Sequence, residues 1–156
     1  MTREALWPYA LEIYGRPGAE ALLLELQDAH GQCVPFLLWA LWMSASDRLA
    51  DAATVRSAAE LARAWQDAAI APLRRLRREL KTAPAPGPRP PRERLREGVK
   101  GLELEAERML LQMLQEASPA PEGPQIALLV GLQRAAEAWG GDPPSDLMAR
   151  LAELAA

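Results

Sequence analysis

The sequence predicts an all-α protein, a compact bundle of six to seven helices with a proline-rich linker. The apolar residues, 49% of the chain, are mostly Ala and Leu, which lose little side-chain freedom in a helix. β-Branched residues are few, and no strand-forming run of Val, Ile, Thr and Tyr occurs. Apolar side chains recur with helical periodicity or fill a segment on all sides, which also favours helix.

The length of 156 residues suits a single domain with its own core. We expect Trp-rich helices over 1–82, a linker over 83–91 and further helices over 92–156. Cys33 is the only cysteine, so the chain has no disulfide framework and no CxxC pair, as is typical of a reducing cytoplasm. The first residues do not read as a signal peptide, and the run Cys33–Met43 is too short to cross a bilayer.

Proline and glycine divide the first part of the chain into helices. The first helix is expected from about Thr2 to Tyr14, with Pro8 at its start or kinking it. The second runs from about Ala19 to His30, closed by Gly31 in a left-handed conformation. The third, about Val34 to Ser44, is apolar nearly all round and should therefore lie at the centre of the bundle.

A fourth helix precedes a strongly basic one. Ser57 and Glu60 have the spacing of a capping box, although the helix could already begin near Thr54. Pro72 should break or bend this helix, and a basic helical segment from Leu73 to Lys81 follows.

The second half of the chain begins with the linker, whose prolines should hold residues 83–91 extended. A row of apolar residues with steps of three and four then predicts a helix that packs through one face. This row, which we call the seam, consists of Leu95, Val99, Leu102, Ala106, Met109 and Met113. Leu110, Leu114 and Ala117 widen the packing face in the C-terminal half of the helix. Gly98 and Gly101 either mark the helix start or admit a close neighbour, and we favour the neighbour. Two shorter helices are expected near 125–139 and 145–155, after a proline-rich break at 118–124.

Charge is distributed unevenly. Residues 74–96 hold nine basic and two acidic side chains, a charge of +7, whereas the remainder carries −10 and the whole chain −3. Clustered arginines such as Arg74, Arg77 and Arg78 could bind nucleic acid phosphates or an anionic membrane. No aromatic residue is interleaved and no recognition motif is visible. We therefore favour packing against an acidic helix, either the chain's own Glu97–Glu107 segment or a partner's.

Enzyme signatures are missing from the sequence. It contains no GxGxxG, phosphate-binding GKS or GKT loop, GxSxG or HExxH motif. The single histidine, His30, lies at an expected helix end, where imidazolium suits the helix dipole. Glu103 and Glu107 share a helical face, which we interpret as a solvated outer face because Lys100 and Arg108 flank them. We predict no catalytic residue, no metal site and no cofactor.

Aromatic residues raise one alternative. Most of the five tryptophans fall among Leu and Ala, which is typical of core positions, but Trp and Met could also line a pocket for an apolar ligand. Combined with the basic and amide residues, they give a set of candidate binding residues. The set is Trp7, Tyr14, Gln27, Asp28, Trp42, Arg74, Arg77 and Arg78.

A family resemblance rests on residues 6–81. Its marks are Leu6-Trp7, the run from Leu26 through Asp28, the Leu37–Trp42 segment, Trp65 and the Pro72–Lys81 run. Together they resemble a family of short, uncharacterised proteobacterial proteins that is described only as a domain of unknown function. The resemblance implies a bacterial, cytoplasmic, helical protein and no particular reaction.

Function is therefore an open choice among three classes at this point. We favour a non-enzymatic protein-interaction or adaptor module, with a protein partner or self-association through the seam. The second is a small helical domain that binds an apolar ligand. The third is an enzyme with an unrecognised site around Gln27 and Asp28.

Overall fold

The computed structural model describes residues 5–82 and 88–156, and within these ranges the chain is all helical, as predicted. The elements are α1 (Leu6–Tyr14), α2 (Ala19–Asp28), α3 (Val34–Ala45), α4 (Ala52–Trp65), the π-helical turn η1 (Gln66–Ile70), α5 (Ala71–Lys81), α6 (Arg89–Glu116), α7 (Leu128–Trp139) and α8 (Ser145–Ala155). Because α4, η1 and α5 follow one another without a gap, the described ranges form seven continuous helical rods. The predicted number of helices is confirmed.

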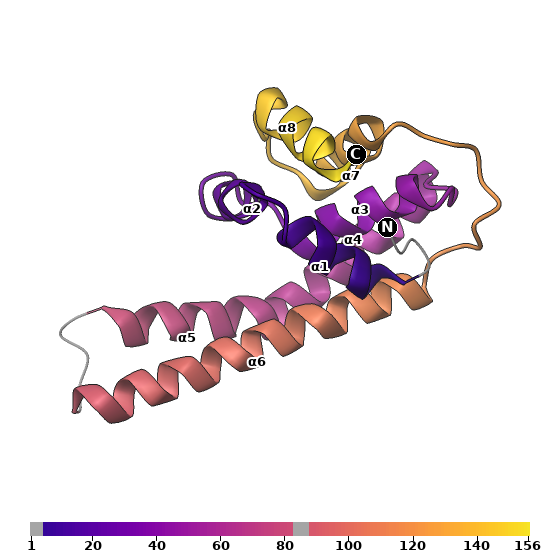
Figure 1. Cartoon of the computed structure of the whole chain (residues 1–156). Helices are drawn as coiled ribbons and strands as arrows, with labels where there is room; N and C mark the ends of the chain where they lie inside the picture. Colours follow the sequence, from indigo (N-terminus) through magenta and orange to yellow (C-terminus); the bar gives the residue numbers. More distant parts are fainter. Residues whose placement is uncertain (1–4, 83–87) are drawn as a thin grey trace.

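The core is built around α3. Every residue of this helix from Val34 to Ser44 is buried, and α1, α2, α4, α6 and α7 all pack against it (Figure 1). A helix without a polar face can be stable only at the centre of a bundle. The sequence-based expectation for this segment is confirmed, and we call the helices around it the body.

The start of α4 differs from the expected capping box. The side chain of Asp51 accepts a hydrogen bond from the backbone N–H of Thr54 at 2.8 Å, and α4 begins at Ala52. An aspartate in extended conformation satisfies the free amides of the first turn as well as a serine does. The Ser57–Glu60 capping box is therefore wrong, and both residues lie inside the helix.

Pro72 does not break the helix. The turn before it, η1, is π-helical, and Pro72 occupies the first turn of α5. Proline has no N–H to donate, and its ring crowds the carbonyl four residues earlier. A wider π turn avoids both conflicts, so the rod continues from the body into a basic helix.

The basic helix and its neighbour form an arm. Helix α5 packs along α6, and Figure 1 shows this pair extending beyond the other helices. We define the arm as α5 together with residues 89–109 of α6. The expected linker is wrong for 89–91, since Pro90 and Pro91 lie in the first turn of α6, where proline costs no hydrogen bond. Residues 83–87 of that prediction lie outside the described residues.

The seam of α6 is rotated from its expected position. Val99 and Ala106 are buried as predicted, but Leu95, Leu102 and Met109 are 57, 58 and 44% exposed. Leu110 and Leu114 are also buried as predicted, and Glu103 and Leu111 complete the buried face. The helix therefore meets its neighbours α1, α3, α4, η1 and α5 mainly through a face turned away from the exposed members of the heptad row.

The prediction for the two glycines of α6 is also wrong. The positions where a Cβ of Gly98 or Gly101 would stand have no atom within 4 Å, so neither glycine admits a neighbour within the chain. Helix α6 starts twelve residues before Gly101, which excludes the helix-start alternative as well.

Other boundaries differ by a few residues. Helix α1 begins at Leu6 with Pro8 in its first turn, and α7 begins at Leu128 instead of 125. Helix α2 ends at Asp28, and Gly31 has the predicted left-handed conformation, with φ of 63°. Among the helices of the described ranges, none combines the length and the apolar character that a membrane span requires.

Candidate functional site

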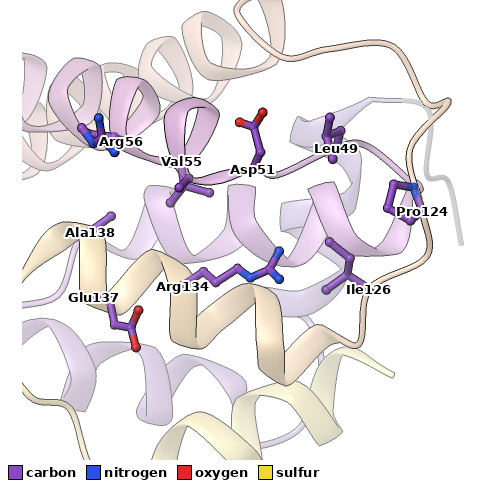
Figure 2. A pocket seen from close by; sticks show the side chains of 10 residues that line it. Leu49, Asp51, Val55, Arg56, Pro124, Ile126, Arg134, Glu137 and Ala138 are labelled. Carbon is purple, nitrogen blue, oxygen red and sulfur yellow. The ribbon is translucent and has the colours of Figure 1, made fainter.

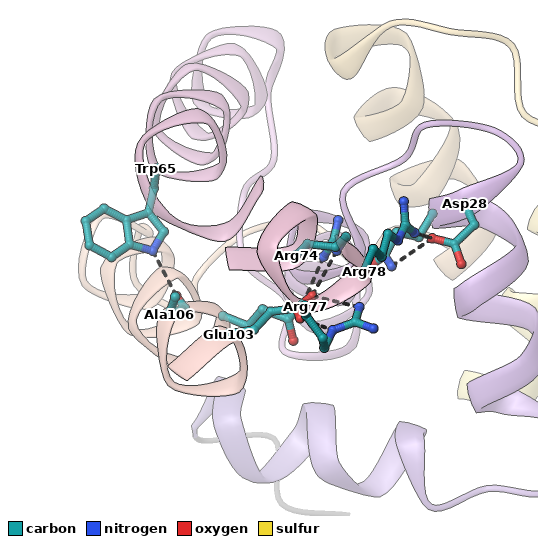
Figure 3. A network of polar contacts seen from close by, with 9 residues as sticks. Asp28, Trp65, Arg74, Arg77, Arg78, Glu103 and Ala106 are labelled. Atoms are coloured by element: carbon teal, nitrogen blue, oxygen red, sulfur yellow. Dashed lines mark hydrogen bonds and ion pairs between the residues drawn. The ribbon is translucent and has the colours of Figure 1, made fainter. Parts of the chain in front are cut away.

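An arginine–glutamate cluster joins the two helices of the arm. Glu103 of α6 accepts from Arg74 Nε at 2.9 Å and from Arg77 Nε at 2.5 Å, and Glu107 accepts from Arg74 Nη2 at 3.2 Å. The side chains of Arg74 and Glu103 are only 13 and 9% exposed. Figure 3 shows the two guanidinium groups converging on Glu103. The expected pairing of Arg74 and Arg77 with the chain's own acidic segment is confirmed.

The two glutamates of this cluster have opposite shifts in pKa. Burial disfavours the charged form of Glu103, but the hydrogen bonds from Arg77 and Arg74 outweigh it and hold the pKa below its ordinary value. Burial dominates at Glu107, and with the charge of Glu103 it raises the pKa above the ordinary value despite Arg74. Glu103 is therefore the anion that holds the two arginines. The interpretation of both glutamates as a solvated outer face is wrong.

Arg78 links the arm to the body. Its Nη2 lies 2.6 Å from Asp28 Oδ1 (Figure 3), and Gln27 Nε2 donates to the same oxygen at 3.1 Å. Arg78 and Asp28 are 54 and 48% exposed, so water screens this pair. Gln27 and Asp28 thus form a contact at the surface, where α2 meets α5.

Tyr14 and Cys33 lie behind the cluster, in the body. Burial, with the nearby charge of Glu107, raises the pKa of the Tyr14 phenol well above its ordinary value. Burial also raises the pKa of the Cys33 thiol to about 12. Both groups therefore remain protonated near neutral pH, and the thiol lacks the thiolate character that reactive cysteines need.

The arm has an apolar side opposite its ion pairs. The arginines that contact Glu103 occupy one edge of α5, and the leucine row of α5 occupies the other edge by helical spacing. In this antiparallel pair the leucine rows of α5 and α6 consequently meet on the side away from the arginines. The exposed members of these rows form what we call the apolar arm face. They are Leu76, Leu95, Leu102 and Met109, each between 42 and 58% exposed.

Trp65 marks the same side of α6. Its indole Nε1 donates to the backbone carbonyl of Ala106 at 2.8 Å, and Ala106 is a helical neighbour of Leu102. Figure 3 shows Trp65 on one side of α6 and the arginine cluster on the other. The indole therefore ties α4 to α6 where the apolar arm face meets the body.

The other candidate aromatics are structural. Trp42 is fully buried, with the guanidinium of Arg48 4.4 Å from its ring centre. Trp7 is half-buried, and Arg108 of α6 lies 5.2 Å from its ring centre. Neither residue joins the arginine cluster, so the candidate set splits between core, body surface and arm.

Two open grooves lie on the body. The larger, about 850 Å³, runs between α4, α7 and the segment before α7, and its apolar lining includes Val55 and Ile126. Asp51, Arg56, Arg134 and Glu137 line it as well (Figure 2). The smaller, about 420 Å³, is lined by Trp39 and by parts of α4 and α6. The larger groove has no Trp or Met in its lining, unlike the apolar-ligand pocket expected from the sequence.

Sequence reasoning missed the central residue of the cluster, Glu103. A usable signal was present: Glu103 and Glu107 are four residues apart on one helix, and Arg74 and Arg77 are three apart on another. Such spacings bring each pair to one helical face. Only the antiparallel packing of α5 on α6 places the two faces together.

Comparison with known proteins gives a family match. A family model described as "Protein of unknown function (DUF2390)" matches residues 5–114. The match confirms the resemblance over 6–81 and extends it through most of α6. No curated protein and no solved structure matches the chain.

Proposed function

We propose that this chain, which belongs to the DUF2390 family of proteins of unknown function, is a non-enzymatic protein-interaction module that binds through the apolar arm face. The observation that supports this proposal is the exposure of the four large apolar side chains of the apolar arm face. Helical spacing places them on one side of the helix pair that projects in Figure 1. Contiguous exposed apolar surface on a small protein is typical of protein-binding sites.

The arm's construction favours binding over catalysis. Its charged side is neutralised by Glu103, Glu107 and Asp28, which hold Arg74, Arg77 and Arg78. These arginines are therefore engaged within the chain, and the side that remains open is apolar. A partner helix or apolar surface could gain from burying it, at roughly 25 cal/mol per Å² of apolar area.

The compartment belongs to the same proposal. The only cysteine is buried and protonated, which fits a module that works in a reducing cytoplasm. We propose a cytoplasmic, bacterial setting on this ground and on the sequence resemblance.

Site-specific photocrosslinking tests the function. A photoreactive phenylalanine analogue is placed at Leu102 in one sample and at Leu104 in the other, in cells that express the protein. Leu104 is 55% exposed, close to the 58% of Leu102. Because Leu104 lies two residues further along the helix, its side chain points to the other side of α6. Covalent protein adducts are expected at Leu102 and not at Leu104.

Two results would contradict the proposal. One is the absence of adducts at either position, since a bound protein must touch the apolar arm face. The other is equal labelling at both positions, which would indicate random collision with exposed leucines.

A further inference from the structure

We propose that the partner of the apolar arm face is a second copy of this chain, bound so that the two α6 helices run antiparallel about a twofold axis. This inference rests on the proposed function and specifies its partner. Most soluble oligomers are assembled from identical chains, and twofold dimers are the commonest of them.

Residue spacing on α6 suits a partner helix. Leu95, Leu102 and Met109 are each seven residues apart and exposed, which is the spacing of one row in a coiled coil. Gly98 lies between the first two of them, and the space above its Cα is open. A helix can approach closely at a glycine, so a leucine of the second copy can pack there.

Charge decides the direction of the pair. The first part of α6, from Arg89 to Lys100, has five basic and two acidic residues, a charge of +3. The second part, from Gly101 to Glu116, has four acidic and one basic residue, but Glu103 and Glu107 already pair with Arg74 and Arg77. The unengaged residues of this part therefore leave a charge of −1. An antiparallel pair places each positive part beside a negative part, whereas a parallel pair places like charges together.

The whole molecule shows the same complementarity. Residues 74–96 carry +7 and the remainder of the chain −10. In the antiparallel pair, the tip of one arm lies beside the body end of the other copy's α6. The antiparallel pair therefore places the excess positive charge of one arm tip beside the part of α6 that holds Glu105 in the other copy.

The shape of the molecule leaves room for this arrangement. Helix α6 has 28 residues, about 42 Å at 1.5 Å per residue, and Figure 1 shows it along one edge with the other helices on a single side. The α6 helix of a second copy can therefore lie along this open edge without a clash between the bodies of the two copies.

One register satisfies both the glycine and the charges. Leu102 packs over Gly98 of the second copy, and by symmetry Gly98 receives Leu102 of that copy. This register also brings Arg94 level with Glu105 of the second copy. Both side chains are exposed in the single chain, so each can turn toward the other.

Sedimentation velocity between about 1 µM and 1 mM tests the association. The full chain of 17.1 kDa is expected to form a dimer, with a dissociation constant that rises in high salt. Leu102→Glu should raise that constant by at least about thirtyfold, because it places two charges at the centre of the interface. Leu104→Glu, on the other side of α6, should leave it unchanged, and circular dichroism checks that both variants fold.

Disulfide trapping tests the direction. A tagged Leu95→Cys chain mixed with a Glu105→Cys chain should form a mixed disulfide under oxidised glutathione, because the antiparallel register places these positions together. Leu95→Cys alone should remain unlinked. A disulfide between two Leu95→Cys chains would show a parallel pair and overturn the proposed orientation.

The outcomes also separate this inference from the proposed function. A chain that stays monomeric up to about 1 mM overturns the second-copy inference. If photocrosslinking at Leu102 then still gives adducts of a different protein, the interaction function stands with another partner. If the chain is monomeric and no adduct forms at Leu102, both proposals fail.

Discussion

The body and the arm of this molecule are stabilised by different means. In the body, α3 buries every residue from Val34 to Ser44, and the surrounding helices supply further apolar contacts. In the arm, α5 has no buried residue, and a charged cluster around Glu103 joins it to α6 alongside half-buried leucines such as Leu73. The body therefore uses its apolar surface to fold, whereas the arm leaves apolar surface exposed and relies on ion pairs for its position.

The difference should appear in the size of mutational effects. Full burial of a large apolar side chain contributes about 1.5–3 kcal/mol, and cavities add to the loss on truncation. Ion pairs contribute little at the surface but become costly to break when one buried charge is left alone. Four changes, from the largest effect to the smallest, test this contrast.

Truncation of the core should have the largest effect. Trp42 is fully buried beneath Arg48, so Trp42→Ala should lower the free energy of unfolding by roughly 3–5 kcal/mol, measured by urea denaturation. Trp7→Ala, at a half-buried position, is the control and should cost clearly less. Equal losses for the two tryptophans would contradict the distinction between core and surface.

Removal of the anion at the centre of the arm should rank second. Glu103→Gln leaves Arg74 and Arg77 without their shared carboxylate and should cost roughly 2–3 kcal/mol, less than for fully buried pairs because the arginines are partly exposed. The matched control is Glu105→Gln, two residues away and exposed, which should change stability by less than about 0.5 kcal/mol. If Glu103→Gln lowered the free energy of unfolding by less than about 1 kcal/mol, contacts other than this cluster would hold the arm in place.

Acid should remove the same contribution gradually. The folded-state pKa of Glu103 lies below its ordinary value of 4.5, so its stabilisation is complete above that value and declines as the pH falls through the lowered pKa. Glu107 has a raised pKa, and its contribution has the opposite sign, present at low pH and lost as the pH rises. The difference between wild type and Glu103→Gln should therefore narrow below about pH 4.5. If the difference in stability between wild type and Glu103→Gln were independent of pH, the charge of Glu103 could not be its cause.

The link between arm and body should have the smallest effect. Arg78 and Asp28 are about half exposed, so Arg78→Gln should cost only about 0–1 kcal/mol, measured by thermal unfolding at low and high salt. High salt should lower the unfolding temperature of the wild type slightly and that of the variant hardly at all. A loss above about 2 kcal/mol would mean that this contact, and not the cluster at Glu103, positions the arm.

The sequence predicted the body more fully than the arm. An apolar segment such as Val34–Ser44 has only one stable place, the centre of a bundle, and composition alone indicates helix. The face through which α6 packs was predicted only in part, because a heptad row shows which residues share a side and not which edge of that side meets the body. Leu95 and Leu102 therefore face solvent although their spacing is that of a seam.

The candidate site was predicted only in part. Arg74 and Arg77 were named, and their pairing with the acidic part of α6 was anticipated, since a basic run in an acidic chain favours such a partner. Glu103 was taken for a solvated residue because its burial depends on the antiparallel packing of α5, a contact that no local pattern encodes. The π turn before Pro72 was also missed, because a proline signals only that the regular helix must change.

The rate at which the Cys33 thiol is alkylated can report how often the body of the protein opens. The thiol is buried at the start of α3, and its pKa of about 12 leaves almost no thiolate at neutral pH. An alkylating reagent can therefore label it only during the moments when α3 leaves the core and the thiol meets water. Most of the other helices pack against α3. The labelling rate therefore measures opening of the body and does not respond to opening of the arm.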